Sequence, residues 1–205
     1  MYLINGEFFI IIGVICYLAI RGFMFIKNKK KKKPTILLTE MTKLLFVTYC
    51  LVVVSVTLFP FPIGFSVEYE NLSAYLNLTP LVSILKQVSL IGTAYDGDIL
   101  FMIGLIIRNV GGNILLFVPL GFLVPLIWKS VIHFNHIFLY AIGISVTIEL
   151  LQLLESIFGG WGRVTDIDDV ICNVAGAILG YYIYKWFRLL SGKYQSSFVH
   201  RLFRV

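Results

Sequence analysis

Long apolar runs divide this sequence, and they constrain its fold more than any other feature. A transmembrane helix needs about 20 predominantly apolar residues to cross the bilayer core. Four runs qualify readily and a fifth, more polar run follows: Ile4–Ile26, Thr42–Ile63, Ile114–Trp128 with its flanks, Ile137–Phe158 and Val170–Phe187. Of the 205 residues, 59% are hydrophobic and only 14% are charged. We therefore predict an all-α fold, a polytopic transmembrane helical bundle of about five spans.

Basic residues set the expected topology. They cluster in the run KNKKKKK (Lys27–Lys33), between the third and fourth spans, and in the C-terminal tail. Since cytoplasmic loops carry an excess of Lys and Arg, these segments are predicted to be cytoplasmic, with the N-terminus outside a multi-pass plasma-membrane protein. The chain then divides into an N-terminal span with its Lys-rich loop (1–34), a membrane domain (35–190) and a basic cytoplasmic tail (191–205).

The Lys run and the cysteines are interpreted as structural features rather than as functional sites. Beside an apolar span, a Lys run is typical of a cytoplasmic flank or a contact with anionic membrane lipids, so no nucleic-acid partner is predicted. Cys16, Cys50 and Cys172 lie in apolar runs at unrelated spacings, which indicates core packing rather than disulfides or a metal site. The sequence predicts no cofactor.

The long segment between the second and third spans, residues 64–108, contains two apolar stretches. LTPLVSILKQVSLIG and DILFMIGLII are both too short to cross a membrane alone. We predict interfacial helices or a re-entrant piece here.

The fifth run carries a polar stripe. Asp166, Asp169, Asn173, Gly176 and Gly180 follow one another at intervals of 3, 4, 3 and 4 residues, so they share one helix face. Polar groups in hydrocarbon are costly, so this face is predicted to line the bundle interior or a wet cavity. The two glycines form a ridge that allows a neighbouring helix to approach closely.

Helix capping is a simpler explanation for the start of this stripe. Thr165 or Asp166 can accept backbone N–H bonds, and Asp168 and Asp169 favour the positive end of the helix dipole. Capping alone does not explain Asn173, which lies further along the same face.

The fourth run contains a second stripe, with Glu149 and Gln152 three residues apart. Glu149 lies on the order of 15 Å inside the outer end of its helix, where a carboxylate needs a partner or a proton. Arg163 is positioned to reach it from the outer loop, and Asn113 or Asn173 can donate hydrogen bonds.

The third run opens with Asn113 and Phe117 on one face and contains Pro119 and Gly121. Proline removes a backbone donor, so a kink is expected nearby. Pro119 and Gly121, with the two glycines of the fifth run, are predicted to shape the helix packing. Together, the three polar faces indicate a cavity that opens outward.

Several motifs resemble those of the VanZ-like family of bacterial membrane proteins. They are NxxLFxPLGF (Asn113–Phe122), ExxQ (Glu149–Gln152), RxxDxxDxxxNxxGxxxG (Arg163–Gly180) and, upstream, LNLTPLVSI (Leu76–Ile84). By position, the resemblance assigns the family's polar motif residues to Asn77, Asn113, Glu149, Gln152, Arg163, Asp166, Asp169 and Asn173. It implies a role at the Gram-positive cell envelope. The founding member is associated with resistance to teicoplanin, a glycopeptide antibiotic with a lipid tail.

The leading hypothesis is a non-enzymatic envelope protein whose outward polar site lies over an apolar groove. Its ligand is a lipid-tailed glycopeptide or a polyprenyl-linked cell-wall precursor. Arg163 is predicted to contact a phosphate or carboxylate of this ligand, and Phe117 and Trp161 to hold the lipid tail.

Three alternatives stay open. An intramembrane enzyme acting on a lipid-linked substrate would use Glu149 as proton carrier and Asp166 and Asp169 as Mg²⁺ or Ca²⁺ ligands, but the sequence has no nucleophile motif and no Gly-rich nucleotide loop. A proton-coupled transporter fits poorly, because five spans show no internal repeat. Finally, the polar residues can form a purely structural network. The oligomeric state is not predicted.

Overall fold

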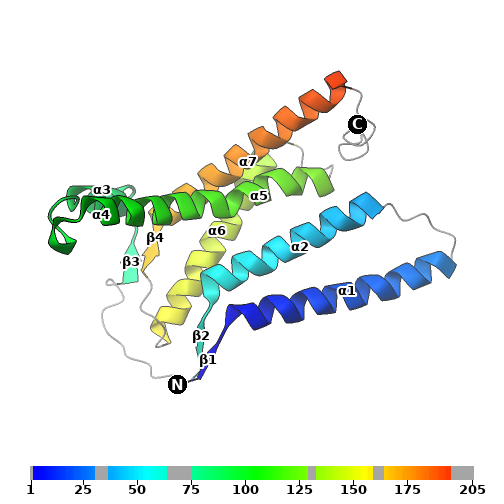
Figure 1. Cartoon of the computed structure of the whole chain (residues 1–205), viewed down its shortest axis with the longest axis horizontal. Coiled ribbons are helices and arrows are strands. Elements are labelled where there is room, and N and C mark those ends of the chain that lie inside the picture. Colours follow the sequence, from blue (N-terminus) through cyan, green and yellow to red (C-terminus); the bar gives the residue numbers. More distant parts are fainter. Residues whose placement is uncertain (1, 31–36, 64–74, 129–132, 159–163, 195–205) are drawn as a thin grey trace.

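The computed structural model describes residues 2–30, 37–63, 75–128, 133–158 and 164–194, and helices dominate this part of the chain (Figure 1). The long helices are α1 (Gly6–Lys30), α2 (Leu37–Leu58), α5 (Gly112–Ile127), α6 (Phe134–Ile157) and α7 (Ile167–Tyr194). The shorter elements are β1 (Tyr2–Ile4), β2 (Phe61–Ile63), β3 (Leu76–Asn77), α3 (Val82–Ser89), η2 (Tyr95–Gly97), α4 (Ile99–Ile106), η3 (Ile107–Gly111) and β4 (Thr165–Asp166). Within the described residues, five helical segments are long and apolar enough to cross a membrane, which confirms the predicted all-α bundle.

The third span is longer than the sequence suggested. α4 continues through η3, a π-helical turn, into α5, so that Ile99–Ile127 is one segment of 29 residues. The stretch DILFMIGLII is therefore continuous with the third span, and its location at the membrane interface stays a prediction. At about 1.5 Å per residue this segment extends about 43 Å, which exceeds the roughly 30 Å hydrocarbon core. Asn113 consequently lies near the middle of the segment rather than at its outer end.

The second span ends earlier than predicted. α2 stops at Leu58 instead of Ile63, because Pro60 lacks an N–H donor and disfavours helical geometry in the residue before it. The residues that follow form β2, which pairs antiparallel with β1 and joins the ends of α1 and α2. Figure 1 shows these two helices side by side along one edge of the molecule.

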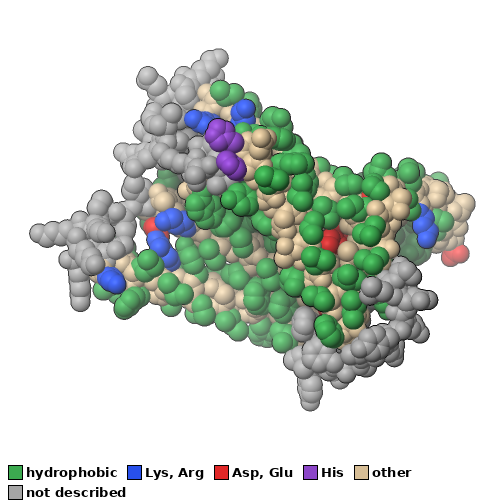
Figure 2. Space-filling model, turned by 180° about the vertical axis from the view of Figure 1, so that it is seen from behind, with side chains coloured by type: hydrophobic (Ala, Val, Ile, Leu, Met, Phe, Trp, Pro, Cys, Tyr) green, Lys and Arg blue, Asp and Glu red, His purple; other side chains and the backbone are tan. Residues whose placement is uncertain are grey.

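An ion pair also links α1 to α2. Arg21 bonds Glu40 Oε2, and the Lys43 ammonium lies 3.5 Å from Glu40 Oε1. Away from such pairs, Figure 2 shows one face of the molecule covered mainly by hydrophobic side chains, the surface expected of helices that contact lipid.

α5 and α7 pack backbone to backbone. A Cβ atom added at Gly176 or Gly180 of α7 would lie 2.0 Å from the carbonyl oxygen of Ile114 or Val118 of α5, respectively. Reciprocally, a Cβ at Gly121 of α5 would lie 1.9 Å from the Ala177 carbonyl oxygen. The glycines expected to shape helix packing therefore lie at the closest helix contact, and this contact fixes α7 against the long third span.

The apolar core lies beside this contact. Phe117 is 0% exposed and packs in a cluster that includes Ile137, Ala141 and Tyr181. The prediction that Phe117 lines an apolar groove is therefore wrong. Helical spacing correctly placed Phe117 on an inward face, but the glycine contact brings α7 close enough to enclose the ring.

Candidate functional site

Two short strands bring distant parts of the chain together at one end of the bundle. β3 and β4 pair in parallel, with Leu76 opposite Thr165 and Asn77 opposite Asp166. The Asn77 Nδ2 group donates to Asp166 Oδ1 at 3.0 Å and to Ser83 Oγ at 2.7 Å. The segment before α3 is thus attached to the start of α7.

Asp168 caps a helix other than its own. Both carboxylate oxygens accept backbone N–H bonds from the start of α3, Oδ1 from Leu81 and Oδ2 from Ile84. Leu81 has a positive φ of 65° and offers no side-chain cap. Asp168 is 2% exposed and provides the acceptors that the first turn of α3 lacks.

Glu149 holds β4 against α6. Its Oε2 atom accepts the Asp166 backbone N–H at 3.0 Å, and its backbone carbonyl accepts the Thr165 hydroxyl at 3.2 Å. The carboxylate is buried, and neither expected amide donor reaches it: Asn113 and Asn173 bond elsewhere. Arg163, the expected cationic partner, lies outside the described residues.

Two amides connect the spans near Glu149. Asn113 Nδ2 on α5 donates to Asp169 Oδ1 on α7 at 2.6 Å. Gln152 Nε2 on α6 donates to the Thr57 carbonyl oxygen at the end of α2, at 2.9 Å. One hydrogen bond thus joins α5 to α7 and the other joins α6 to α2, both at the same end of the bundle.

A cavity of about 750 Å³ lies among these elements. Its lining comes from α2, α3, η3, α5, α6, β4 and α7 and from Val164, which precedes β4: Val56, Ser83, Ile84, Gln87, Arg108, Asn109, Val110, Gly112, Asn113, Leu116, Gln152, Val164, Asp166, Asp168, Asp169 and Cys172. This volume lies within the range typical of small-molecule sites.

Some of the residues predicted from the sequence line this cavity and others support it. Asn113, Gln152, Asp166 and Asp169 belong to the lining. The remaining described polar residues lie behind it: Asn77 and Glu149 hold β4, and Asn173 donates to Ser145 Oγ at 2.8 Å in the contact between α6 and α7. Arg163 and Trp161 lie outside the described residues.

Sequence reasoning missed several polar lining residues, among them Arg108 and Gln87. Arg108 lies in the π-helical turn, and among the described lining residues it is the single cation. It directly follows the run DILFMIGLII, and a charge at the end of an apolar run is a usable signal. Because that run was not recognised as the start of the third span, Arg108 received no role.

The lining is rich in both hydrogen-bond donors and hydrogen-bond acceptors. Three carboxylates can accept from hydroxyl, amide or ammonium donors, and the amides and the guanidinium can donate. Among the residues that the structure describes, no group of three or more His, Cys, Asp or Glu side chains could hold a metal ion. The cavity can therefore exchange hydrogen bonds with a polar ligand as both donor and acceptor.

Comparisons with known proteins agree with the motif pattern. The VanZ/LLP1 family profile matches residues 46–188, which is more than two thirds of the chain. Protein VanZ of Enterococcus faecium is 34% identical over 77 residues, which is 38% of this chain and 44% of that relative. The chain thus aligns with less than half of the length of this relative. No solved structure matches significantly. On the family profile and the membrane-spanning fold, this chain belongs to the VanZ/LLP1 family.

Proposed function

We propose that this protein binds the polar head of a lipid-tailed molecule in the cavity, in a non-enzymatic role at the bacterial envelope. The observation that carries the proposal is the mixed lining of one 750 Å³ cavity, with carboxylates, amides and a guanidinium beside apolar side chains. Small-molecule sites characteristically combine apolar walls with a few polar groups that orient the ligand.

The route for the tail runs past α2. Val56 lines the cavity and is also 61% exposed on the surface of the bundle. Leu116 and Val110 extend the apolar part of the lining along the third span. In this proposal, Val56 is the apolar side chain at which a lipid tail leaves the cavity toward the membrane.

The cavity faces the outside of the cell in this proposal. It lies at the end of the bundle where α2 ends and α7 begins, whereas Lys27, Lys29 and Lys30 lie in the last turn of α1, and α2 begins at the same end of this helix pair. The basic residues Lys185 and Arg188 also lie far along α7 from this end. The positive-inside rule then puts the basic end in the cytoplasm and the cavity at the outer surface.

Two ligand classes carry polar groups that match the lining of the outward cavity: a lipid-tailed glycopeptide of the teicoplanin type and a polyprenyl-linked wall precursor. Both combine a head rich in donors and acceptors with an apolar chain. Membership of the VanZ/LLP1 family makes teicoplanin the first ligand to test.

The test is growth inhibition of a susceptible Gram-positive host that expresses this protein. Teicoplanin is compared with vancomycin, which serves as the glycopeptide without a lipid tail, at matched membrane abundance of each variant. Asp169→Asn removes one of the three negative charges of the cavity lining but keeps an oxygen that can accept from Asn113. Asp96→Asn is the matched control, because Asp96 is exposed and does not line the cavity.

We expect selective protection against teicoplanin that Asp169→Asn loses and Asp96→Asn keeps. Equal protection by both variants would contradict the site.

A structural role is the second candidate, and the contacts of Asp168 favour it for part of the network. Both of its oxygens are occupied by backbone N–H groups of α3. If Asp169 were structural in the same way, Asp169→Asn would lower the melting temperature in proportion to any loss of protection. A loss of protection at unchanged melting temperature separates the two roles.

A further inference from the structure

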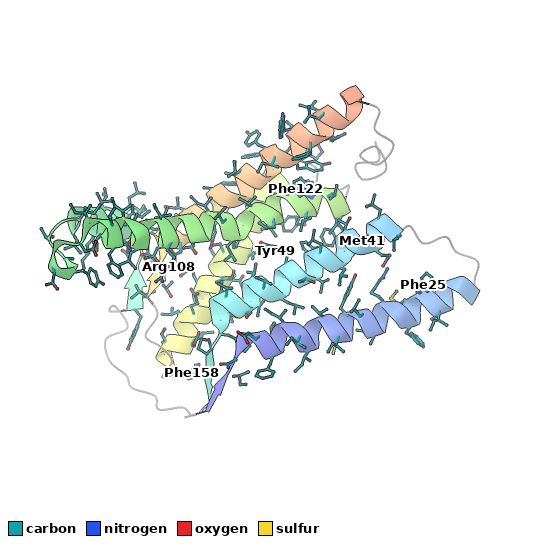
Figure 3. The ribbon with its side chains drawn as sticks, in the orientation of Figure 1. Phe25, Met41, Tyr49, Arg108, Phe122 and Phe158 are labelled. Atoms are coloured by element: carbon teal, nitrogen blue, oxygen red, sulfur yellow. The ribbon has the colours of Figure 1, made fainter. Side chains whose placement is uncertain are left out.

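Arg108 occupies an unusual position in the third span. It lies in the π-helical turn between α4 and α5, and π-helical insertions in α-helices occur frequently at functional sites. Figure 3 labels Arg108 beside β3, β4 and α7, where it lines the cavity. Its side chain is exposed, so the guanidinium is accessible to a ligand.

The carboxylates near Arg108 are engaged with other groups. Asp168 accepts two backbone N–H bonds, Asp166 Oδ1 accepts from Asn77, and Asp169 Oδ1 accepts from Asn113. Within the described part of the chain, the ion pairs closer than 4.0 Å involve Glu40 and not these aspartates. Arg108 therefore lines a cavity with three carboxylates without forming an ion pair to any of them.

A second lining residue also lacks a partner. The Oε1 atom of Gln87 on α3 is shielded from solvent and finds no hydrogen-bond partner among the described residues. A buried acceptor without a donor is costly, and such groups are usually satisfied by water or by a ligand. A donor on a bound head group would satisfy this oxygen.

We propose that Arg108 binds an oxyanion of the ligand, and that the cavity thereby accepts a lipid-tailed phosphate whose neighbouring hydroxyl or amide donors reach Gln87. This inference rests on the proposed function of the cavity and names its ligand chemistry. The guanidinium fork matches phosphate oxygens in a bidentate arrangement. The three aspartates repel an oxyanion, and among the described lining residues Arg108 is the one that can offset this repulsion at close range.

The test uses the full chain in phosphatidylcholine nanodiscs, with undecaprenyl phosphate, undecaprenol and inorganic phosphate as separate probes. The variants are Arg108→Gln, Arg108→Lys and the control Lys86→Gln, which removes an exposed positive charge of α3 outside the cavity lining. Teicoplanin binding to the same samples reports on the cavity independently.

We expect undecaprenyl phosphate to bind at least about tenfold more tightly than undecaprenol, because a charge-assisted contact is lost with the phosphate. Arg108→Gln removes that preference, Arg108→Lys keeps part of it, and Lys86→Gln keeps all of it. Tighter binding of undecaprenyl phosphate than of inorganic phosphate shows that the tail contributes. Equal binding of the two would indicate a site for free phosphate and overturn the assignment of a lipid ligand.

Two results overturn the role of Arg108. If undecaprenyl phosphate and undecaprenol bind equally and teicoplanin still binds, the proposed function stands and the oxyanion site is wrong. The same holds if Arg108→Gln retains the preference for the phosphate. If none of the probes binds and teicoplanin does not bind either, both the oxyanion site and the proposed function are wrong.

Discussion

Replacing Gly180 by alanine tests how α7 is held against the third span. The added Cβ would lie 2.0 Å from the carbonyl oxygen of Val118 and 2.9 Å from its carbonyl carbon. Real Cβ atoms essentially never come within 3.0 Å of another heavy atom at such a contact. Because the obstacle is backbone in the middle of a helix, the two helices have to move apart by about 1 Å.

The size of the effect follows from this displacement. A gap of about 1 Å between packed surfaces forfeits roughly a quarter to a half of their dispersion attraction. Overpacking typically lowers the free energy of unfolding by about 1–3 kcal/mol, and we expect a value near the upper end of this range because the obstacle is rigid backbone. A loss of about 3 kcal/mol corresponds to a fall of roughly 6–12 °C in the melting temperature of a chain of this size.

The assay is thermal inactivation of purified protein in detergent, read as the fraction that remains monodisperse after heating. Gly143→Ala in α6 is the control, because a Cβ there meets no atom within 4 Å and alanine improves helix propensity. We expect Gly143→Ala to melt at or above the temperature of the unmodified protein. Gly13→Ala should be intermediate, since its obstacle is the flexible Leu51 side chain. Equal melting temperatures for Gly180→Ala and Gly143→Ala would refute the packing argument.

Three further substitutions probe the polar network. Asp168→Ala leaves two backbone N–H groups at the start of α3 without acceptors, and each unsatisfied group costs about 1–3 kcal/mol of stability. We therefore expect faster proteolysis between α3 and α4 in Asp168→Ala than in Asp168→Asn. Asn173→Ala removes the hydrogen bond to Ser145. Hydrogen bonds between membrane helices contribute about 0.6 kcal/mol on average, so the melting temperature should fall by only a few degrees. Asp169→Asn should leave the melting temperature within about 2 °C of the unmodified protein while protection against teicoplanin is lost.

The sequence predicted the helical bundle well because the spans are local features. Length and hydropathy locate a membrane helix without any tertiary contact, and five spans were confirmed. The face that carries Gly176 and Gly180 was also predictable, since helical spacing fixes which residues share a face. The third span was too short in the prediction, because its first half and second half are separated by Arg108 and two glycines that locally interrupt the apolar run.

The roles of individual site residues were harder to predict. Asp168 was expected to interact with the dipole at the start of its own helix, but its carboxylate oxygens accept from the start of α3, which lies more than 80 residues earlier in the chain. Glu149 was expected to pair with a side-chain donor and instead accepts a backbone N–H of β4. Neither partner is visible in a local pattern, because the parallel pairing of β3 with β4 brings these segments together. Helical spacing could place Phe117 on an inward face without showing whether that face lines a cavity or the core.

Direct binding to the purified protein tests the central claim, that the cavity holds the head of a lipid-tailed molecule. The measurement is fluorescence anisotropy of labelled teicoplanin with the full chain in nanodiscs, for the unmodified protein, Asp169→Asn and Asp96→Asn. We predict binding that competes with unlabelled teicoplanin but not with vancomycin, and that weakens at least about tenfold in Asp169→Asn alone. Saturable binding with the same affinity in all three proteins would contradict the cavity as the binding site.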